Sequence, residues 1–193
     1  MTDPKARLFV AVEVPARVRD GIEPATEPLR RRQPEARWVE PSAFHLTLAF
    51  VGWVDDEGAR AVEKACAEAA GSVGPFELAL SGRAGTFGSG VLWAGVGDSA
   101  EFDRLAGAVR QAMADRDLLV ETRPFHGHLT LARAGRGARI RPGLAQGYEG
   151  PQLSWRVDRL ALMRSRLRRA GAHYSVEAAW PLGEDGTAAG AGD

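Results

Sequence analysis

The 193-residue sequence predicts an α+β fold built from two similar lobes. Strand-like runs of alternating apolar residues are interspersed with helix-like segments, and the stretch HLTLA occurs twice, at residues 45–49 and 128–132. Each half of the chain therefore combines helices, strands and one HLTLA copy, which indicates an internal repeat. No GxGxxG motif, which would hold a phosphate, follows the first strand, so a doubly wound sheet has little support.

The N-terminal half is expected to alternate strands and helices. Residues 6–15 carry Phe9, Val10, Val12 and Val14 before a closing proline, as in a strand. Apolar residues at helical spacing predict a helix over 16–33, which Pro24 and Pro28 are expected to shorten or kink. The other elements expected in this half are a strand over 37–39, a strand over 45–51 and a helix over 57–70.

The C-terminal half is expected to be richer in strands. A glycine-rich loop at 81–90 is expected to separate two of them, and LRRAGA has the right length to join the last two as a hairpin. Residues 183–193 have no apolar anchor and are expected to be disordered, which leaves residues 1–182 as one two-lobed domain. The elements expected here are strands over 75–82, 91–97, 128–132, 155–167 and 172–182 and a helix over 100–114.

The composition excludes several classes of protein. Lys plus Arg and Asp plus Glu number 25 each, so any attraction to an anion must be local. The single cysteine, Cys66, excludes an intramolecular disulfide, and its small apolar neighbours argue against a nucleophile. The apolar run LFVAV is too short for a secretion signal, and no run approaches a membrane span. We therefore expect a cytoplasmic protein with no membrane partner and, without an apolar surface helix, a monomer.

The repeated stretch carries the chemistry. On a strand, alternate residues share a face, so His45 and Thr47 project one way, as do His128 and Thr130. If the two lobes face each other across a cleft, two imidazoles and two hydroxyls converge. Imidazole titrates near pH 6.5, so one ring can accept a proton while the other donates one. Such a set suits in-line attack at phosphorus; two ordinary strands with surface histidines are the alternative left open.

His126 adds a third imidazole near the second copy. His126 and His128 have the H-x-H spacing seen in metal sites, but no carboxylate lies within six residues downstream of His128. We therefore expect no metal. Instead, we expect His126 to lie at the edge of the cleft, where it could touch a base or a phosphate.

Several arginines are candidates for binding phosphate or RNA. Arg133 shares a face with neither His128 nor Thr130 in a regular strand, but it could reach a phosphate at the end of the strand. Phe87 is available to stack on a base. The run 30–32 is expected to be solvated, and solvated charge is an equal alternative for the remaining arginines. The residues that could track an RNA backbone are Arg164, Arg166 and Arg168 and, in the loop 133–143, Arg136, Arg139 and Arg141.

Five blocks of the chain, in this order, resemble the RNA 2′,3′-cyclic phosphodiesterase family, also called 2′-5′ RNA ligases, of the 2H phosphoesterase superfamily. The blocks are RLFVAVEVP; RWVEPSAFHLTLAFVG; PFELALSG with GTFGSG and VLWAGV; FHGHLTLARAG; and MRSRL with AHYSVEAAWPL. The resemblance covers residues 6–182. Its specific part is the pair of His-x-Thr-Leu motifs, and the RWV and SRL blocks strengthen it.

The resemblance implies a two-lobed fold, each lobe an antiparallel sheet with flanking helices, and an active site in the cleft between them. It implies that His45 is the proton donor to the leaving 3′-oxygen and that His128 is the proton acceptor that activates water. Thr47 and Thr130 would hold the phosphate, with Arg133 as a further candidate. Such proteins open 2′,3′-cyclic phosphate ends of RNA to 2′-phosphates and can ligate tRNA halves through a 2′-5′ linkage without a nucleotide cofactor.

One position departs from the family pattern. Proline often precedes the second histidine, whereas this chain has Gly127, which gives a looser approach to the strand. Two other functions stay open on the sequence alone. One is an RNA- or nucleotide-binding module without turnover, and the other is a phosphodiesterase for a small cyclic phosphate.

Overall fold

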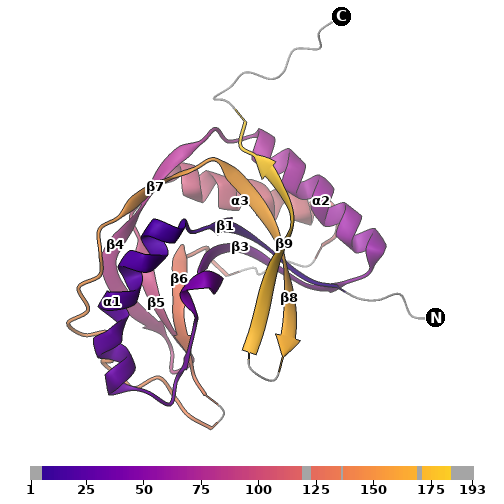
Figure 1. Ribbon diagram of the computed structural model, residues 1–193. Helices are drawn as coiled ribbons and strands as arrows, with labels where there is room; N and C mark the ends of the chain where they lie inside the picture. Colours follow the sequence, from indigo (N-terminus) through magenta and orange to yellow (C-terminus); the bar gives the residue numbers. More distant parts are fainter. Residues whose placement is uncertain (1–5, 119–122, 136, 169–170, 184–193) are drawn as a thin grey trace, which may run out of the picture.

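The computed structural model describes residues 6–118, 123–135, 137–168 and 171–183, so the expected disorder of 183–193 falls almost wholly outside the described residues. Figure 1 shows the arrangement of the elements. They are β1 (Ala6–Glu13), α1 (Ala16–Arg32), β2 (Arg37–Trp38), the 3₁₀ turn η1 (Pro41–Ala43), β3 (His45–Val54), α2 (Asp56–Gly71), β4 (Phe76–Phe87), β5 (Val91–Val96), α3 (Ala100–Ala114), β6 (His128–Arg133), β7 (Ser154–Val157), β8 (Arg159–Arg168) and β9 (Gly171–Pro181).

The strands form one antiparallel sheet in the order β7-β4-β5-β6-β3-β1-β8-β9, and β2 also pairs with β6. This confirms the α+β antiparallel fold. Although β7 and β8 stand far apart in this order, β7 ends at Val157 and β8 begins at Arg159. The sheet must therefore curl until its β7 edge approaches β8, and Figure 1 shows the resulting arch.

The sheet has two similar halves that meet where β3 pairs with β6. Beyond β3 lie β1, β8 and β9, and beyond β6 lie β5, β4 and β7. Each half thus places an HLTLA strand at the centre and further antiparallel strands outside it. The sequence predicts two lobes, whereas in the structure both halves belong to one continuous sheet.

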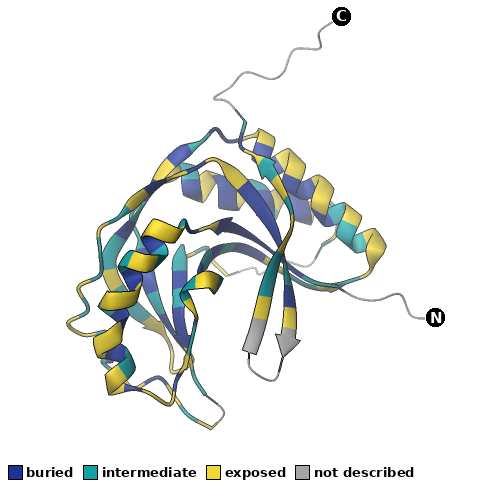
Figure 2. Ribbon diagram, viewed as in Figure 1, coloured by how far each residue is buried: buried dark blue, intermediate teal, exposed yellow. Residues whose placement is uncertain are grey.

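Two helices cover one part of the sheet together. α2 and α3 pack against each other, α2 contacts β1, β8 and β9, and α3 contacts β3 and β4. Both start at a side-chain cap, because Asp55 accepts from the amide of Gly58 and Ser99 accepts from the amide of Phe102. Figure 2 shows buried residues along their inner faces.

α1 packs elsewhere, against the first residue of β7 and the residue before it. The Arg17 guanidinium donates to the Ser154 carbonyl at 2.7 Å, and the Leu153 side chain lies over Gly21. The helix is continuous through Pro24 and Pro28, so the expected shortening does not occur. Both prolines lie on its exposed side, so its inward face of Val18, Ile22, Thr26 and Leu29 stays intact.

The glycine-rich stretch 81–90, expected to be a loop, is largely strand. β4 continues to Phe87, and its residues 84–87 pair with β5. The indole of Trp93 lies so close over Gly85 that a β-carbon there would overlap it. Glycine in this strand therefore leaves room for an aromatic neighbour rather than ending the strand.

The strands predicted at the end of the chain differ in one respect from those in the structure. The expected strand over 155–167 divides at Asp158 into β7, which pairs with β4, and β8, which pairs with β1 and β9. The predicted hairpin is confirmed as the β8–β9 pair.

Within the described part of the chain, none of the helices combines the length and apolar character that a membrane span needs.

Candidate active site

The two HLTLA strands pair with each other at equivalent residues. Leu46 of β3 is the antiparallel partner of Leu129 of β6, and both leucines are fully buried. Because the strands run in opposite directions, His45 comes opposite Thr130, and Thr47 comes opposite His128. The four polar side chains are half-buried, as the alternation within the motif predicts.

Each motif contains a β-bulge at the same position. Leu48 is an extra residue of β3 relative to β1, and Leu131 is an extra residue of β6 relative to β5. In each copy, the leucine and the alanine after it are both buried. The bulge shifts the alternation by one residue, so Arg133 emerges on the face of His128 and Thr130. The expectation from a regular strand, that it shares a face with neither, is therefore wrong.

A small pocket opens between the two motifs. It is lined by His45 of the first copy and by Thr130 and Arg133 of the second, together with Val39, Ala43 and Tyr174. Thr47 and His128 do not line this pocket, but the charge of His128 is near enough to lower the pKa of His45. The fold thus brings side chains of both copies to one place.

Both imidazoles are held in the same way. Nδ1 of His45 lies 2.8 Å from the Ala43 carbonyl, and Nδ1 of His128 lies 2.7 Å from the His126 carbonyl. A carbonyl oxygen only accepts, so each Nδ1 carries the proton and donates it. In the neutral ring, Nε2 is then the free acceptor, and in the charged ring it is a donor. Each histidine therefore presents the same nitrogen for proton transfer.

Burial lowers the pKa of both histidines. For His45 the hydrogen bond to Ala43 raises the pKa and opposes this effect, while the charges of Arg133 and His128 lower the pKa further. For His128, burial is likewise the largest cause, and the charges of His126 and Arg133 add to it. Both rings thus favour the neutral form in the free protein, and an anion between them would favour a proton on one of them.

The aromatic surroundings of the two histidines differ. The His45 ring lies 4.8 Å from the buried Phe9 ring and 4.9 Å from the Tyr174 ring. The His128 ring lies 4.8 Å from that of Phe87, which is 39% exposed. Phe9 and Tyr174 were not among the residues singled out from the sequence. They reach His45 through strand pairings that no local pattern specifies.

Gly127 is packed tightly. A β-carbon there would lie 2.6 Å from Cε1 of Phe102 and 2.9 Å from Cγ2 of Val96. The glycine therefore lets the chain pass close under α3 just before β6. Together with the carbonyl bond to Nδ1, this packing positions His128 despite the departure from proline.

His126 and Cys66 were considered as a metal ligand and as a nucleophile. The rings of His126 and His128 are 6.2 Å apart, and His126 also packs on Trp93. Within the described ranges, no three His, Cys, Asp or Glu side chains gather as metal ligands would. Burial raises the pKa of the Cys66 thiol to about 12, so it stays protonated, as its apolar setting predicts.

The arginines expected to track RNA fall into two places. On β8, Arg164 forms an ion pair with Glu177 at 2.9 Å, and Arg166 is exposed. In the loop after β6, Arg139 is exposed and Arg141 is paired with Glu35 at 3.0 Å. Arg136 and the side chain of Arg168 lie outside the described residues.

Several known proteins are similar to this chain over most of its length. The RNA 2′,3′-cyclic phosphodiesterase of Bacillus subtilis is 30% identical over 182 residues, which cover 91% of this chain and 97% of that protein. The protein of the same name from Escherichia coli is 32% identical over 187 residues, 94% of this chain and 99% of that protein. The crystal structure of Escherichia coli LigT complexed with 3′-AMP matches with a TM-score of 0.75 at 30% identity, covering 93% of this chain and 99% of that one.

A family model also matches most of the sequence. The model of the 2′-5′ RNA ligase superfamily matches residues 16–169, a range that includes both HLTLA strands and their bulges. The chain belongs to the 2′-5′ RNA ligase superfamily.

Proposed function

We propose that this protein hydrolyses the 2′,3′-cyclic phosphate at the end of an RNA to a 2′-phosphate. The observation that carries the proposal is the direct pairing of the two HLTLA strands, which sets the imidazole of each copy opposite the hydroxyl of the other. The similar proteins named RNA 2′,3′-cyclic phosphodiesterase support the same reaction.

Each of the two imidazoles carries out one of the two proton transfers. Nε2 of His128 takes a proton from water as the water oxygen bonds to phosphorus. The bond from phosphorus to the 3′-oxygen breaks, and Nε2 of His45 donates its proton to that oxygen. This assignment of donor and acceptor follows the family resemblance, and the roles exchange in the reverse reaction.

The phosphate lies between the two motifs in this proposal. The hydroxyls of Thr47 and Thr130 donate to its non-bridging oxygens, and the Arg133 guanidinium neutralises its charge. The placement of His45, Thr130 and Arg133 around one pocket supports this arrangement. No step requires a metal or a nucleotide cofactor.

We also propose the biological setting expected from the sequence. The protein acts in the cytoplasm as a monomer, and its RNA substrates include tRNA halves that carry 2′,3′-cyclic phosphate ends. With the 5′-hydroxyl of a second RNA in place of water, the same attack on phosphorus breaks the bond to the 3′-oxygen and forms a 2′-5′ linkage. The same two proton transfers serve both reactions.

One assay tests the proposal. The protein is incubated with an RNA oligonucleotide that ends in a 2′,3′-cyclic phosphate, with a chelator present, and the products are identified by phosphorus NMR. The expected product is the 2′-phosphate. A 3′-phosphate product, or unchanged RNA, would contradict the proposal.

The same assay separates the alternatives. Unchanged RNA that nevertheless binds in a salt-sensitive way indicates a binding module without turnover. Hydrolysis of a cyclic mononucleotide but not of an oligonucleotide indicates a phosphodiesterase for a small cyclic phosphate.

A further inference from the structure

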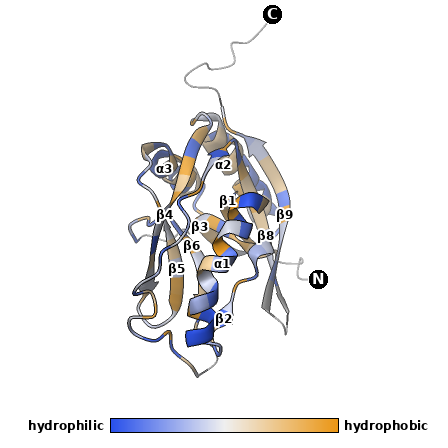
Figure 3. Cartoon of the chain, turned by 60° about the vertical axis from the view of Figure 1, so that its left-hand side comes forward, coloured by the Kyte–Doolittle hydropathy of each residue, from blue (hydrophilic) through white to orange (hydrophobic). Residues whose placement is uncertain are grey.

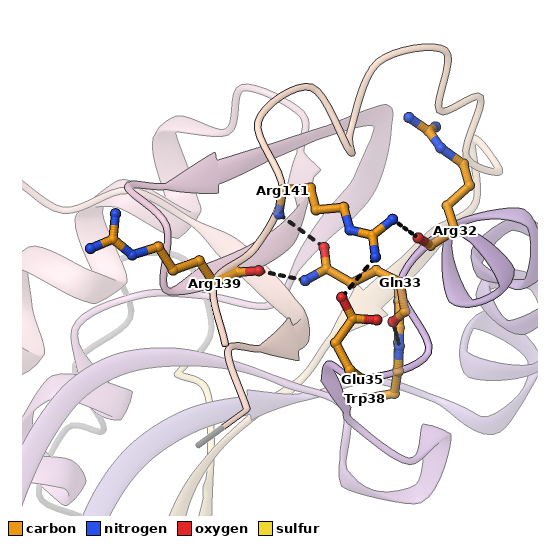
Figure 4. Close-up of polar contacts among 6 residues, drawn as sticks. All are labelled: Arg32, Gln33, Glu35, Trp38, Arg139 and Arg141. Carbon is orange, nitrogen blue, oxygen red and sulfur yellow. Dashed lines mark hydrogen bonds and ion pairs between the residues drawn. The ribbon is translucent and has the colours of Figure 1, made fainter. Parts of the chain in front are cut away.

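The C-terminal end of α1 is clamped to the loop after β6 by one buried amide. The side chain of Gln33 is fully buried, its Nε2 donates to the Arg139 carbonyl at 2.6 Å, and its Oε1 accepts from the Arg141 amide at 2.9 Å. The Trp38 indole donates to the Gln33 carbonyl at 3.0 Å. These bonds, drawn in Figure 4, fix the loop against both α1 and β2.

The guanidinium groups of Arg141 and Arg32 are held in place beside this clamp. Arg141 donates to the Arg32 carbonyl at 2.9 Å and to the Glu35 carboxylate at 3.0 Å. Arg32 donates to the Leu144 carbonyl at 3.2 Å. Because a carbonyl carries no net charge, this bond orients the Arg32 guanidinium without neutralising it.

An open pocket lies beside these groups. It has a volume of about 410 Å³ and is lined by Arg31, Arg32, Arg141, Pro142 and Leu144. Arg139 is exposed, and Figure 4 shows its guanidinium pointing away from the clamp. Figure 3 shows strongly hydrophilic colour at this end of α1.

β2 connects this region to the candidate active site. Arg37 of β2 is the antiparallel partner of Arg133 of β6, and both are exposed. Since Arg37 and Val39 are two residues apart on extended chain, they share a face, and Val39 lines the same pocket as Arg133. Positive groups therefore continue from the pocket around His45 to the end of α1.

We infer that this series of guanidinium groups, which we call the arginine track, binds the phosphate backbone of the RNA strand that carries the reactive end. The arginine track consists of Arg31, Arg32, Arg37, Arg133, Arg139 and Arg141. The inference rests on the proposed function for the identity of the reactive end. The arginine track specifies where the RNA beyond its reactive end binds. It also makes a polymer, rather than a small cyclic phosphate, the substrate.

The charge distribution favours a polyanion. The whole chain has a formal net charge of zero, yet the arginine track gathers six arginines. In the described part of the chain, the salt bridges found among them are those of Arg31 with Glu27 and of Arg141 with Glu35. A single phosphate would occupy only the end at Arg133, whereas successive phosphates of one strand can engage successive guanidinium groups. The clamp at Gln33 holds some of these groups before RNA binds, which lowers the entropic cost of ordering them.

The test uses a double variant, Arg31→Gln with Arg139→Gln, because neither side chain lines the candidate active site. The matched control is Arg104→Gln on α3. Arg31 and Arg104 are each 66% exposed, and each pairs with a glutamate of its own helix, Glu27 at 3.3 Å and Glu101 at 3.4 Å. Removal of either charge should therefore affect the stability of the protein similarly.

KM and kcat are measured for two cyclic-phosphate-ended RNAs, a dinucleotide and an oligonucleotide of about 12 nucleotides. In the double variant, we expect KM for the longer RNA to rise about 3- to 10-fold, with kcat and both dinucleotide constants unchanged. The control should match the wild type on both substrates.

Binding of the longer RNA with an unreactive 2′-phosphate end is followed by fluorescence anisotropy at several salt concentrations. The loss of two phosphate contacts should lower the slope of log K against log salt by about 1.4. Equal slopes for the double variant, the control and the wild type would overturn the arginine track. If the wild type hydrolyses neither RNA, the proposed function fails, and this binding measurement still decides the arginine track by itself.

Discussion

Leu46 and Leu129, the second residues of the two HLTLA copies, are direct partners across adjacent antiparallel strands. Antiparallel pairing of equivalent residues is what an approximate two-fold axis between the strands produces. Each copy therefore supplies half of one site, an imidazole and a hydroxyl on the face opposite the leucines.

Replacement of either motif histidine should remove catalysis. His45→Ala or His128→Ala should lower kcat by about 10² to 10⁴-fold, because each removes one of the two proton transfers. His173→Ala on β9, an exposed position, is the control and should keep full activity. Circular dichroism checks the fold of each variant, and full activity in either motif variant would eliminate the two-histidine mechanism.

The tautomer of both histidines is testable. The carbonyls of Ala43 and His126 accept from Nδ1, so the neutral rings should be protonated at Nδ1 and unprotonated at Nε2. Nitrogen-15 NMR of the histidine rings above their pKa reports this directly. A neutral ring protonated at Nε2 would show that the carbonyl contact does not set the orientation.

The pH dependence should differ between kcat/KM and kcat. Burial and nearby positive charge lower the pKa of His45 and His128 in the free protein. kcat/KM requires one ring protonated and one neutral, so it should be bell-shaped with an optimum below about pH 6.5. A bound phosphate anion stabilises the imidazolium, so the optimum of kcat should lie at higher pH. Coincident optima above neutrality would be inconsistent with these shifts.

Gly127 should tolerate no side chain. In Gly127→Ala, the added methyl group would press on Phe102 and Val96 and should destabilise the protein by about 1 to 3 kcal/mol. Gly107→Ala is the matched control, since nothing lies within 4 Å of a β-carbon at that helical position. That substitution should stabilise the protein by up to about 1 kcal/mol. Urea denaturation measures both changes, and similar stabilities for the two variants would refute the packing argument.

The threonine hydroxyls should act in the transition state. Thr130→Val keeps the shape of the side chain but removes the donor, and kcat should fall by about 10²-fold. Thr130→Ser should restore most of the activity. The approximate two-fold relation predicts a comparable loss in Thr47→Val, and a loss confined to KM would assign the hydroxyls to ground-state binding alone.

Much of the candidate site could be predicted locally. Alternation within HLTLA places each histidine and threonine on one strand face, and the structure confirms the strands and the burial of the leucines between them. The position of Arg133 could not be predicted, because the bulge at Leu131 appears only when β6 pairs with β5. Gly85 of β4 was misleading for a similar reason, because its neighbour, Trp93, comes from another strand.

The sequence by itself determined the periodicity of the elements, the two copies of the motif and the chemistry that imidazole and hydroxyl groups can perform. These follow from side chains within a few residues of one another. The tertiary structure decided that Leu46 meets Leu129, that Tyr174 and Phe9 enclose His45 and that Arg37 extends the positive groups beyond Arg133. Such contacts join strands distant in sequence, and their register is set by the packing of the whole curved sheet.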